Sequence, residues 1–387
     1  MHQQAPGHAL PALAEMVADI EALVTCESPS EDLDAVARSG ETVAALGTRL
    51  LGVAPERIVL DGWTHLRWRF GAHPRVLLLG HHDTVWPLGS LETHPFAIDG
   101  GVLRGPGCFD MKTGLVMAMH ALAVLDLRDG VTLLVTGDEE IGSPSSRRLI
   151  EHEARGCAAA LVLEAAAPGG ALKTERKGVS RYDVLVTGRA AHAGLEPERG
   201  VNATVEVAHQ VHAVAAIADP ERGTTVTPTR LDAGTTINTV PAAAGFGVDV
   251  RVRDQDEQDR VHRAMHGLRP VLAGAEVEVV GGPNRPPLTP AATRGLYERA
   301  ARIAARLGID PPTSASVGGA SDGNYTAGVG TPTLDGLGAV GGGAHADDEH
   351  VVLAELLDRT RLLTALVADL LAEPTRPAGS VGTEGRP

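Results

Sequence analysis

The sequence predicts an α/β fold in which a mostly parallel sheet carries the chemistry and a second, smaller domain is inserted into the chain. Short apolar runs alternate with helical stretches in the first half, and this pattern changes near residue 178. Acidic and imidazole side chains follow the apolar runs. A further histidine, His345, comes after the region in which the pattern differs. With 387 residues and 43% hydrophobic content, the chain can build two domains with cores of their own.

The first half follows the alternating pattern of an open α/β domain. Its strands are expected to be buried and parallel, because each is a continuous apolar run. We expect helices over residues 13–23, 32–51 and 111–125, and strands over 75–80 and 131–135. Residues 1–177 form the first part of this domain in our interpretation, and residues 290–372 form its second part.

Residues 178–289 have a different order of elements. We expect a strand over 181–188, a helix over 201–218, strands over 224–232 and 246–252, a helix over 256–272 and a strand over 275–280. This βαββαβ order is the ferredoxin-like arrangement. An insertion of this kind lies beside the cleft of its host domain, so it can act as a lid or a dimerisation surface, with hinges near 177–178 and 286–290. Residues 373–387 are rich in Pro, Gly and Thr and are expected to be disordered.

Acidic and imidazole side chains are placed where the expected strands end. Because the carboxyl ends of parallel strands meet at one edge of a sheet, we expect these side chains to converge. The set comprises His81, Asp83, Asp110, Glu139, Glu140, Glu164 and His345.

Imidazole nitrogen and carboxylate oxygen are the ligands that zinc prefers, and two ions about 3.5 Å apart need a bridging carboxylate. In an extended segment His81 and Asp83 point the same way, so the acid can fix the tautomer of the imidazole. The adjacent Glu139 and Glu140 point opposite ways, so one can bind metal while the other acts on water as a general base. The set has the outline of a hydrolase site.

Five motifs in a fixed order make a resemblance specific. They are GHHDTV at 80–85, GPGCFDMK at 105–112, DEEIGS at 138–143, GRAAHAG at 188–194 and GGGAH at 341–345. With them, nearly the whole chain resembles the two-zinc metallopeptidase family that includes bacterial glutamate carboxypeptidase, acetylornithine deacetylase, succinyl-diaminopimelate desuccinylase and aminoacylase. The resemblance implies a zinc-peptidase catalytic domain, an inserted lid and dimerisation domain, and two Zn²⁺ ions, with Co²⁺ or Mn²⁺ as alternatives.

The resemblance also implies roles for the converging side chains. Asp83 would orient His81, and Glu139 would be the base. A cis peptide bond is implied after Asp110, which would bridge the two ions. The ligand sets would be His81, Asp110 and Glu164 for one ion, and Asp110, Glu140 and His345 for the other.

Further residues are candidates for recognising substrate. His192 resembles a family histidine that reaches the site of a neighbouring subunit, so the resemblance implies a homodimer through residues 178–289. Asn238 and Arg251 resemble positions near the substrate carboxylate. Arg285 is a second arginine candidate, because a planar guanidinium meets a carboxylate bidentately. For each arginine a plain surface role is the alternative. Gly319 corresponds to a segment that lines the substrate pocket with backbone N–H groups.

The activity that this set favours is hydrolysis of the amide bond to a C-terminal amino acid, most like the glutamate carboxypeptidase branch. An N-acyl amino acid deacylase, or aminoacylase, would use the same residues. A non-catalytic metal-binding relative is a third interpretation, but a purely structural site would not need the extra carboxylate of Glu139. The acyl group, the amino acid cleaved and the native metal stay open.

Charge and composition restrict the partners. The chain has 34 Lys and Arg against 49 Asp and Glu, a net charge of −15, which disfavours binding to duplex nucleic acid or to an anionic membrane. Three cysteines without close spacing fit a reducing compartment, and the N-terminus has no secretory pattern. We therefore expect a cytoplasmic protein that acts on a small peptide or N-acyl amino acid.

Overall fold

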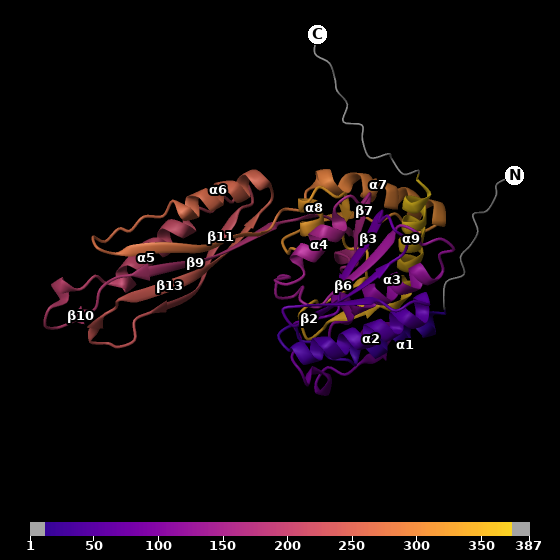
Figure 1. The fold of residues 1–387 in the computed structure, drawn as a ribbon, viewed down its shortest axis with the longest axis horizontal. Helices are drawn as coiled ribbons and strands as arrows, with labels where there is room; N and C mark the ends of the chain where they lie inside the picture. Colours follow the sequence, from indigo (N-terminus) through magenta and orange to yellow (C-terminus); the bar gives the residue numbers. More distant parts are fainter. Residues whose placement is uncertain (1–11, 374–387) are drawn as a thin grey trace, which may run out of the picture.

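The computed structural model describes residues 12–373, and it confirms the α/β class. Two bodies lie end to end in Figure 1, one built around a six-stranded sheet and the other around a four-stranded sheet. Residues 1–11 and 374–387 lie outside the described part. The tail expected to be disordered, residues 373–387, therefore falls outside it except for Glu373. Within residues 12–373, no helix combines the length and the apolar character needed to cross a membrane.

The six-stranded sheet has four parallel strands in its centre and at one edge, and an antiparallel hairpin at the other edge. In sheet order the strands are β1 (Glu56–Leu60), β2 (Trp63–Arg69), β6 (Val131–Thr136), β3 (Val76–His81), β7 (Ala159–Val162) and β16 (Thr333–Leu334). Both central strands are buried along their whole length, as the continuous apolar runs predict.

Helices cover both faces of this sheet. Alternate residues of β3 belong to two different cores, with Leu78 packed against one layer of helices and Leu77 and Leu79 against the other. The larger layer comprises α1 (Leu13–Val24), α2 (Leu33–Leu51), α3 (Thr113–Ala123), α7 (Pro290–Leu307) and α9 (Leu353–Ala372). The opposite layer comprises α4 (Arg147–Ala154) and α8 (Gly323–Gly328).

Two smaller sheets bring distant loops together beside the main sheet. One pairs β8 (Leu172–Arg176) with β15 (Ser314–Val317) in parallel. The other has the order β17 (Gly341–Gly342), β18 (His350–Val352), β5 (Val102–Arg104) and β4 (Ala97–Asp99). The second of these holds the loop before Asp110 next to the loop that contains His345.

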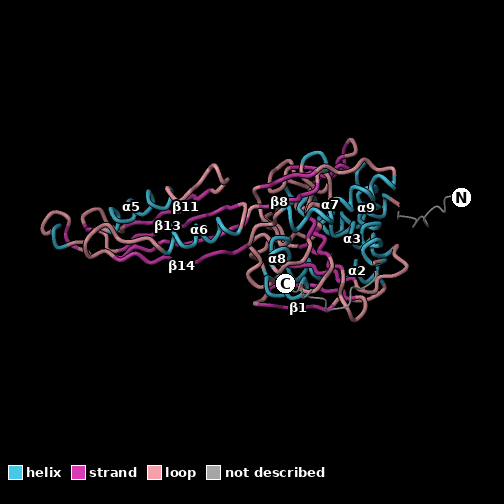
Figure 2. The backbone as a smooth tube through the Cα atoms, turned by 90° about the horizontal axis from the view of Figure 1, so that it is seen from above, coloured by secondary structure: helices cyan, strands magenta, loops and turns pink. Residues whose placement is uncertain are grey.

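The inserted sheet is antiparallel throughout, and Figure 2 shows its long strands leading away from the larger body. Its sheet order is β11 (Thr225–Ala233), β13 (Ala243–Val252), β9 (Gly178–Thr187) and β14 (Glu276–Arg285), with α5 (Ala203–Ala215) and α6 (Gln255–His266) between strands. The chain order of these elements agrees with the expected βαββαβ unit. Two short strands, β10 (Ala191–His192) and β12 (Thr239–Val240), pair with each other outside that sheet.

Both helices of the insertion lie on one face of its sheet. Val184 and Val186 of β9 pack with Val207 of α5 and with Val261 of α6 in a single core. The alternate residues of β9 point to the other face and are exposed. The insertion therefore has one covered and one open face.

Some elements differ from those that the sequence predicts. The hairpin of β1 and β2 was missed, although its turn is Asp61-Gly62, with φ of 50° and 95°. Helix α3 begins at Thr113, not 111, because Asp110 and Met111 have non-helical backbone angles, and the peptide bond between them is cis, as expected. Helix α6 ends at His266, well before 272, because Gly267 is a poor helix former and Pro270 cannot continue the helix. The exact domain boundaries stay predictions.

Candidate metal centre

His81 ends β3 and is held by the residue two positions on. Its Nδ1 lies 3.0 Å from the carbonyl oxygen of Asp83 and 3.4 Å from the Asp83 carboxylate. The carboxylate of Asp83 also accepts hydrogen bonds from the backbone N–H groups of Glu139 and Glu140, at 3.2 and 3.1 Å. One buried acid therefore orients the imidazole and positions both glutamates after β6.

Asp110 lies between two groups of side chains. Its Oδ1 is 3.3 Å from His81 Nε2, which is also 3.8 Å from Glu164 Oε1. Its Oδ2 is 3.2 Å from His345 Nε2, which is 3.1 Å from Glu140 Oε2. Within each three-residue group the potential ligand atoms lie within 4.8 Å of one another. All five expected ligands are thus brought together, and Asp110 is common to both groups.

Unpaired nitrogen and oxygen atoms of the two groups are suited to bind a divalent cation. His81 Nε2, Asp110 Oδ1 and Glu140 Oε1 are buried and have no hydrogen-bond partner in the structure. Leaving such groups unpaired is costly, and a cation between them would satisfy them. Burial raises the pKa of Glu140 to about 7, although the neighbouring His345 acts in the opposite direction. Three nitrogen or oxygen ligands per group also leave a position open for water, as in catalytic zinc sites.

His345 reaches the centre from a glycine-rich loop. Its backbone has a φ of 62°, a left-handed conformation that is uncommon for a residue with a side chain. Its side chain is 49% exposed, whereas that of His81 is 2% exposed. The second group of ligands is therefore the one nearer to solvent.

Glu139 lies beside the ligands without belonging to either group. Its Oε1 is 2.9 Å from Arg285 Nη2, at the end of β14. Burial raises the pKa of Glu139 well above its usual range, and the charge of Arg285 acts in the opposite direction. A carboxyl that lies beside the ligand groups without belonging to them is free to exchange a proton with water.

Arg285 belongs to a buried network with Glu139 and with two residues that the sequence does not single out. Its Nη2 also lies 3.0 Å from Asp322 Oδ1 and 3.0 Å from Ser143 Oγ. Ser143 ends the DEEIGS motif and Asp322 comes three residues after Gly319, but polar residue types alone do not distinguish either from turn residues. Arg285 therefore contacts Glu139, the expected base, whereas its chemistry predicts a place near the substrate carboxylate.

The other substrate candidates are spread over the molecule. The carbonyl of Gly319 accepts a hydrogen bond from Arg176, which also lies 3.2 Å from Glu164, so Gly319 is close to the first group. Arg251 is on β13, where it pairs with Asp249 at 2.8 Å.

His192 and Asn238 lie together in the insertion but not at the metal centre. The short strands β10 and β12 pair there, and Ala193 donates a hydrogen bond to the carbonyl of Asn238 at 2.9 Å. Figure 1 places β10 at the end of the insertion that is farthest from the larger body. Both side chains are exposed. Within one chain they cannot contact a substrate held at the ligand groups.

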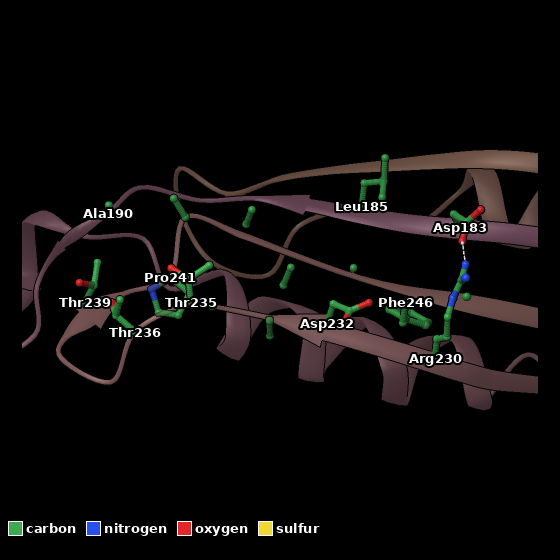
Figure 3. Close-up of a pocket in the computed structure, with 17 residues that line it drawn as sticks. Asp183, Leu185, Ala190, Arg230, Asp232, Thr235, Thr236, Thr239, Pro241 and Phe246 are labelled. Carbon is green, nitrogen blue, oxygen red and sulfur yellow. Dashed lines mark ion pairs between the residues drawn. The ribbon is translucent and has the colours of Figure 1, made fainter.

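The insertion also contains a groove. This groove has a volume of about 590 Å³ and includes the exposed Leu185 on the open face of the inserted sheet. Figure 3 shows Asp183 and Arg230 at its border, where they form an ion pair at 3.6 Å. None of the potential metal ligands lines it. Convergent ligands identify a reactive centre better than cavity size does, so we assign the chemistry to the residues around Asp110.

Comparison with known proteins supports this assignment. Residues 77–369 match the model of peptidase family M20/M25/M40. The chain belongs to this family. It is therefore a metal-dependent hydrolase.

Two bacterial proteins resemble the chain over most of its length. Carboxypeptidase G2 of Pseudomonas sp. (strain RS-16) is 30% identical over 372 residues, which cover 92% of this chain and 89% of that protein. Succinyl-diaminopimelate desuccinylase of Thioalkalivibrio sulfidiphilus (strain HL-EbGR7) is 26% identical, with coverage of 84% and 91%.

Solved structures share the fold. An M20 family metallo-carboxypeptidase from Sulfolobus solfataricus superposes with a TM-score of 0.70 at 16% identity, over 92% of this chain and 98% of that one. A dinuclear metal binding peptidase from Bacillus subtilis has a TM-score of 0.62 at 15% identity, over 93% and 98%. At these identities the likeness shows the fold alone.

Proposed function

We propose that this M20 hydrolase cleaves the amide bond to a C-terminal amino acid, as a glutamate carboxypeptidase-like enzyme with two Zn²⁺ ions. The observation that carries the proposal is the placing of Asp110 between two three-residue ligand groups, with the buried carboxyl of Glu139 beside them. The 30% identity to carboxypeptidase G2 over most of both chains supports the carboxypeptidase class.

Each residue of the centre has a defined task in this proposal. Bound divalent ions polarise the scissile carbonyl and make a water molecule more acidic. Glu139 accepts a proton from that water and returns it to the leaving nitrogen. Asp83 keeps Nδ1 of His81 engaged, so Nε2 faces the ligand group. Arg285 holds the carboxyl of Glu139 in place.

A deacylase acting on N-acyl amino acids is the second candidate, because the chain is also 26% identical to a desuccinylase. The two activities use the same residues and differ in the group on the acyl side of the bond. A hydrolysis screen with added zinc separates them, if it compares dipeptides with N-acyl amino acids. Cleavage of only simple N-acyl amino acids would contradict the carboxypeptidase proposal.

The adjacent glutamates allow a matched test of the base. Glu139→Gln removes the proton acceptor but leaves all five ligands, so the variant should keep its metal and lose at least about 100-fold in kcat. The same substitution at Glu140 removes a ligand, so Glu140→Gln should lose metal from the His345 group. Metal content measured beside kcat distinguishes the two. A fully loaded Glu139→Gln protein with near-normal kcat would remove Glu139 from the mechanism.

We also propose a homodimer through residues 178–289, in which His192 acts at the site of the partner. Three features support it. The inserted sheet has an open face with a groove, His192 lies at the far end from its own metal centre, and Leu195 and Ile237 beside it are strongly exposed apolar residues. Exposed apolar groups of this kind mark contact surfaces.

Mixing inactive subunits tests this arrangement. A dimer of one His192→Ala chain and one Glu139→Gln chain has one site with both groups intact if His192 acts in the partner. Random exchange should then restore about a quarter of the wild-type activity. Mixing Glu139→Gln with His345→Ala is the control, because neither site is then complete. If heterodimers form and the first mixture stays as inactive as the control, His192 does not act across the interface.

A further inference from the structure

Glu349 has a buried carboxylate that accepts four hydrogen bonds around the loop that carries Asp110. Its Oε1 accepts from the backbone N–H groups of Phe109 and Asp110, at 2.8 and 3.0 Å. Its Oε2 accepts from the backbone N–H of Gly107 and from Nε1 of Trp86, at 3.0 and 2.6 Å. We propose that Glu349 is a positioning residue that holds Asp110 in the geometry needed to serve both ligand groups.

The hydrogen bonds of Glu349 explain how an ionised carboxylate is tolerated in this place. The residue is 3% exposed, and it makes no ion pair in the described part of the chain. Its charge is compensated instead by four donors, two for each oxygen. Three of these donors are consecutive or nearly consecutive backbone N–H groups, so the carboxylate fixes the path of the main chain from Gly107 to Asp110.

The position of Glu349 in the chain gives this contact a wider consequence. Glu349 is four residues after His345 and directly precedes β18, which pairs with β5. Trp86 is three residues after Asp83, which orients His81. One side chain therefore joins three segments: the one after β3, the Asp110 loop and the His345 loop. The separation of Asp110 from His345 depends on this junction, so we expect the junction to affect ion binding at both groups.

Glu349→Gln is the decisive variant, because it preserves size but replaces one acceptor oxygen by an NH₂ group that faces two N–H donors. Asp347→Asn is the matched control, since Asp347 lies on the same loop with a side chain that is 94% exposed. Zn²⁺ titration into the metal-free proteins, followed by calorimetry, should show affinity about 10- to 100-fold weaker for Glu349→Gln and unchanged for Asp347→Asn. The absorption bands of bound Co²⁺ should also shift in Glu349→Gln.

This inference rests on the proposed metal centre, and the titration separates the failure of the two. If the wild-type protein binds no ion, the centre itself is wrong. If the wild type binds ions and folded Glu349→Gln binds them equally, with the same Co²⁺ spectrum, the positioning role is wrong, even when the variant unfolds at a lower temperature. Should Glu349→Gln fail to fold, Trp86→Phe removes a single donor and should weaken binding by a few-fold. Unchanged affinity in that variant would also overturn the proposal.

Discussion

Polar side chains are buried at the strand ends of the six-stranded sheet but exposed on the open face of strand β9 in the inserted sheet. In the six-stranded sheet β3 and β6 are covered on both faces, and the polar residues at their ends are buried next to one another. In the inserted sheet β9 alternates between buried and exposed residues, and His192 and Asn238 are exposed at the far end. One region brings all five potential metal ligands together, whereas His192 and Asn238 of the other can reach a substrate only through contact with another domain or chain.

This difference shows how the chemistry is divided. Buried carboxylates and imidazoles are held by the fold before any substrate arrives, which favours a preorganised centre. The exposed groups of the insertion stay in contact with water, and they would move with the insertion if it closed. Lid closure or a partner chain is therefore the step that should bring them to the substrate.

The largest effect is expected from Asp110→Asn. Asp110 supplies one oxygen to each ligand group, and a neutral amide cannot bridge two cations in the same way. We expect both ions to be lost and activity to fall by more than about 100-fold, since even residues that only support ligands contribute 10- to 100-fold. Metal analysis and kcat measured on the purified variant check this.

Two comparison variants sharpen the Asp110 result. His345→Ala removes a ligand from one group only, so it should retain the ion held by His81 and Glu164. Asp126→Asn changes an exposed aspartate in the loop after α3 and should leave metal content and kcat unchanged. Retention of two ions by Asp110→Asn would contradict the shared position of Asp110.

A smaller but still large effect is expected on stability from the arginines. Arg285→Ala leaves Glu139 and Asp322 buried without their cation, and breaking a buried pair costs about 3–5 kcal/mol. The same change at Arg230 breaks a pair on the open face of the insertion, where the side chain is 77% exposed, and should cost less than about 1 kcal/mol. Urea unfolding of the two variants at one pH measures both. Equal losses would contradict the contrast between the two regions.

Much of this arrangement could be predicted from the sequence, and particular residues show why. His81, Glu139 and Glu164 follow apolar runs, and a run that ends in a polar group predicts both a buried strand and the edge where its last residue lies. The order of the motifs placed Asp110 and His345 with them. The hairpin of β1 and β2 was missed although Asp61-Gly62 is a strong turn signal, because its strands mix arginine and histidine with apolar residues.

Other features had no local signal. Glu349 follows two aspartates in a polar loop, and only the pairing of β18 with β5 brings its carboxylate to the Asp110 loop. Arg285 was expected to bind substrate on the basis of its chemistry, but its contact with Glu139 depends on where β14 ends relative to the other sheet. Contacts between segments far apart in the chain are set by packing and topology, which residue patterns describe poorly.

The smallest predicted effect concerns a buried acid in the insertion, Glu257, and it tests whether a charge in this region also contributes to stability. Glu257 accepts hydrogen bonds from Arg260, Thr224 and Arg222, and with Arg260 as the main cause these contacts lower its pKa to about 2. Its pKa in the unfolded chain is higher, about 4.3. The stabilisation is therefore complete above the unfolded value and is lost as the pH falls toward 2.

Glu257→Gln should accordingly be less stable than the wild type at neutral pH, and the gap between the two should narrow on acidification. We expect the gap to shrink by about 1 kcal/mol between pH 7 and about pH 3.5, because the partner arginines are partly exposed and their pairing is screened. Urea unfolding of both metal-free proteins at the two pH values measures this gap. The metal ligands titrate in both proteins, so their contribution cancels in the difference. Glu276→Gln on β14 is the control, since Glu276 is exposed and makes no side-chain hydrogen bond or ion pair within residues 12–373. A gap that stays constant, or that widens toward acid, would show that the charge of Glu257 does not stabilise the insertion.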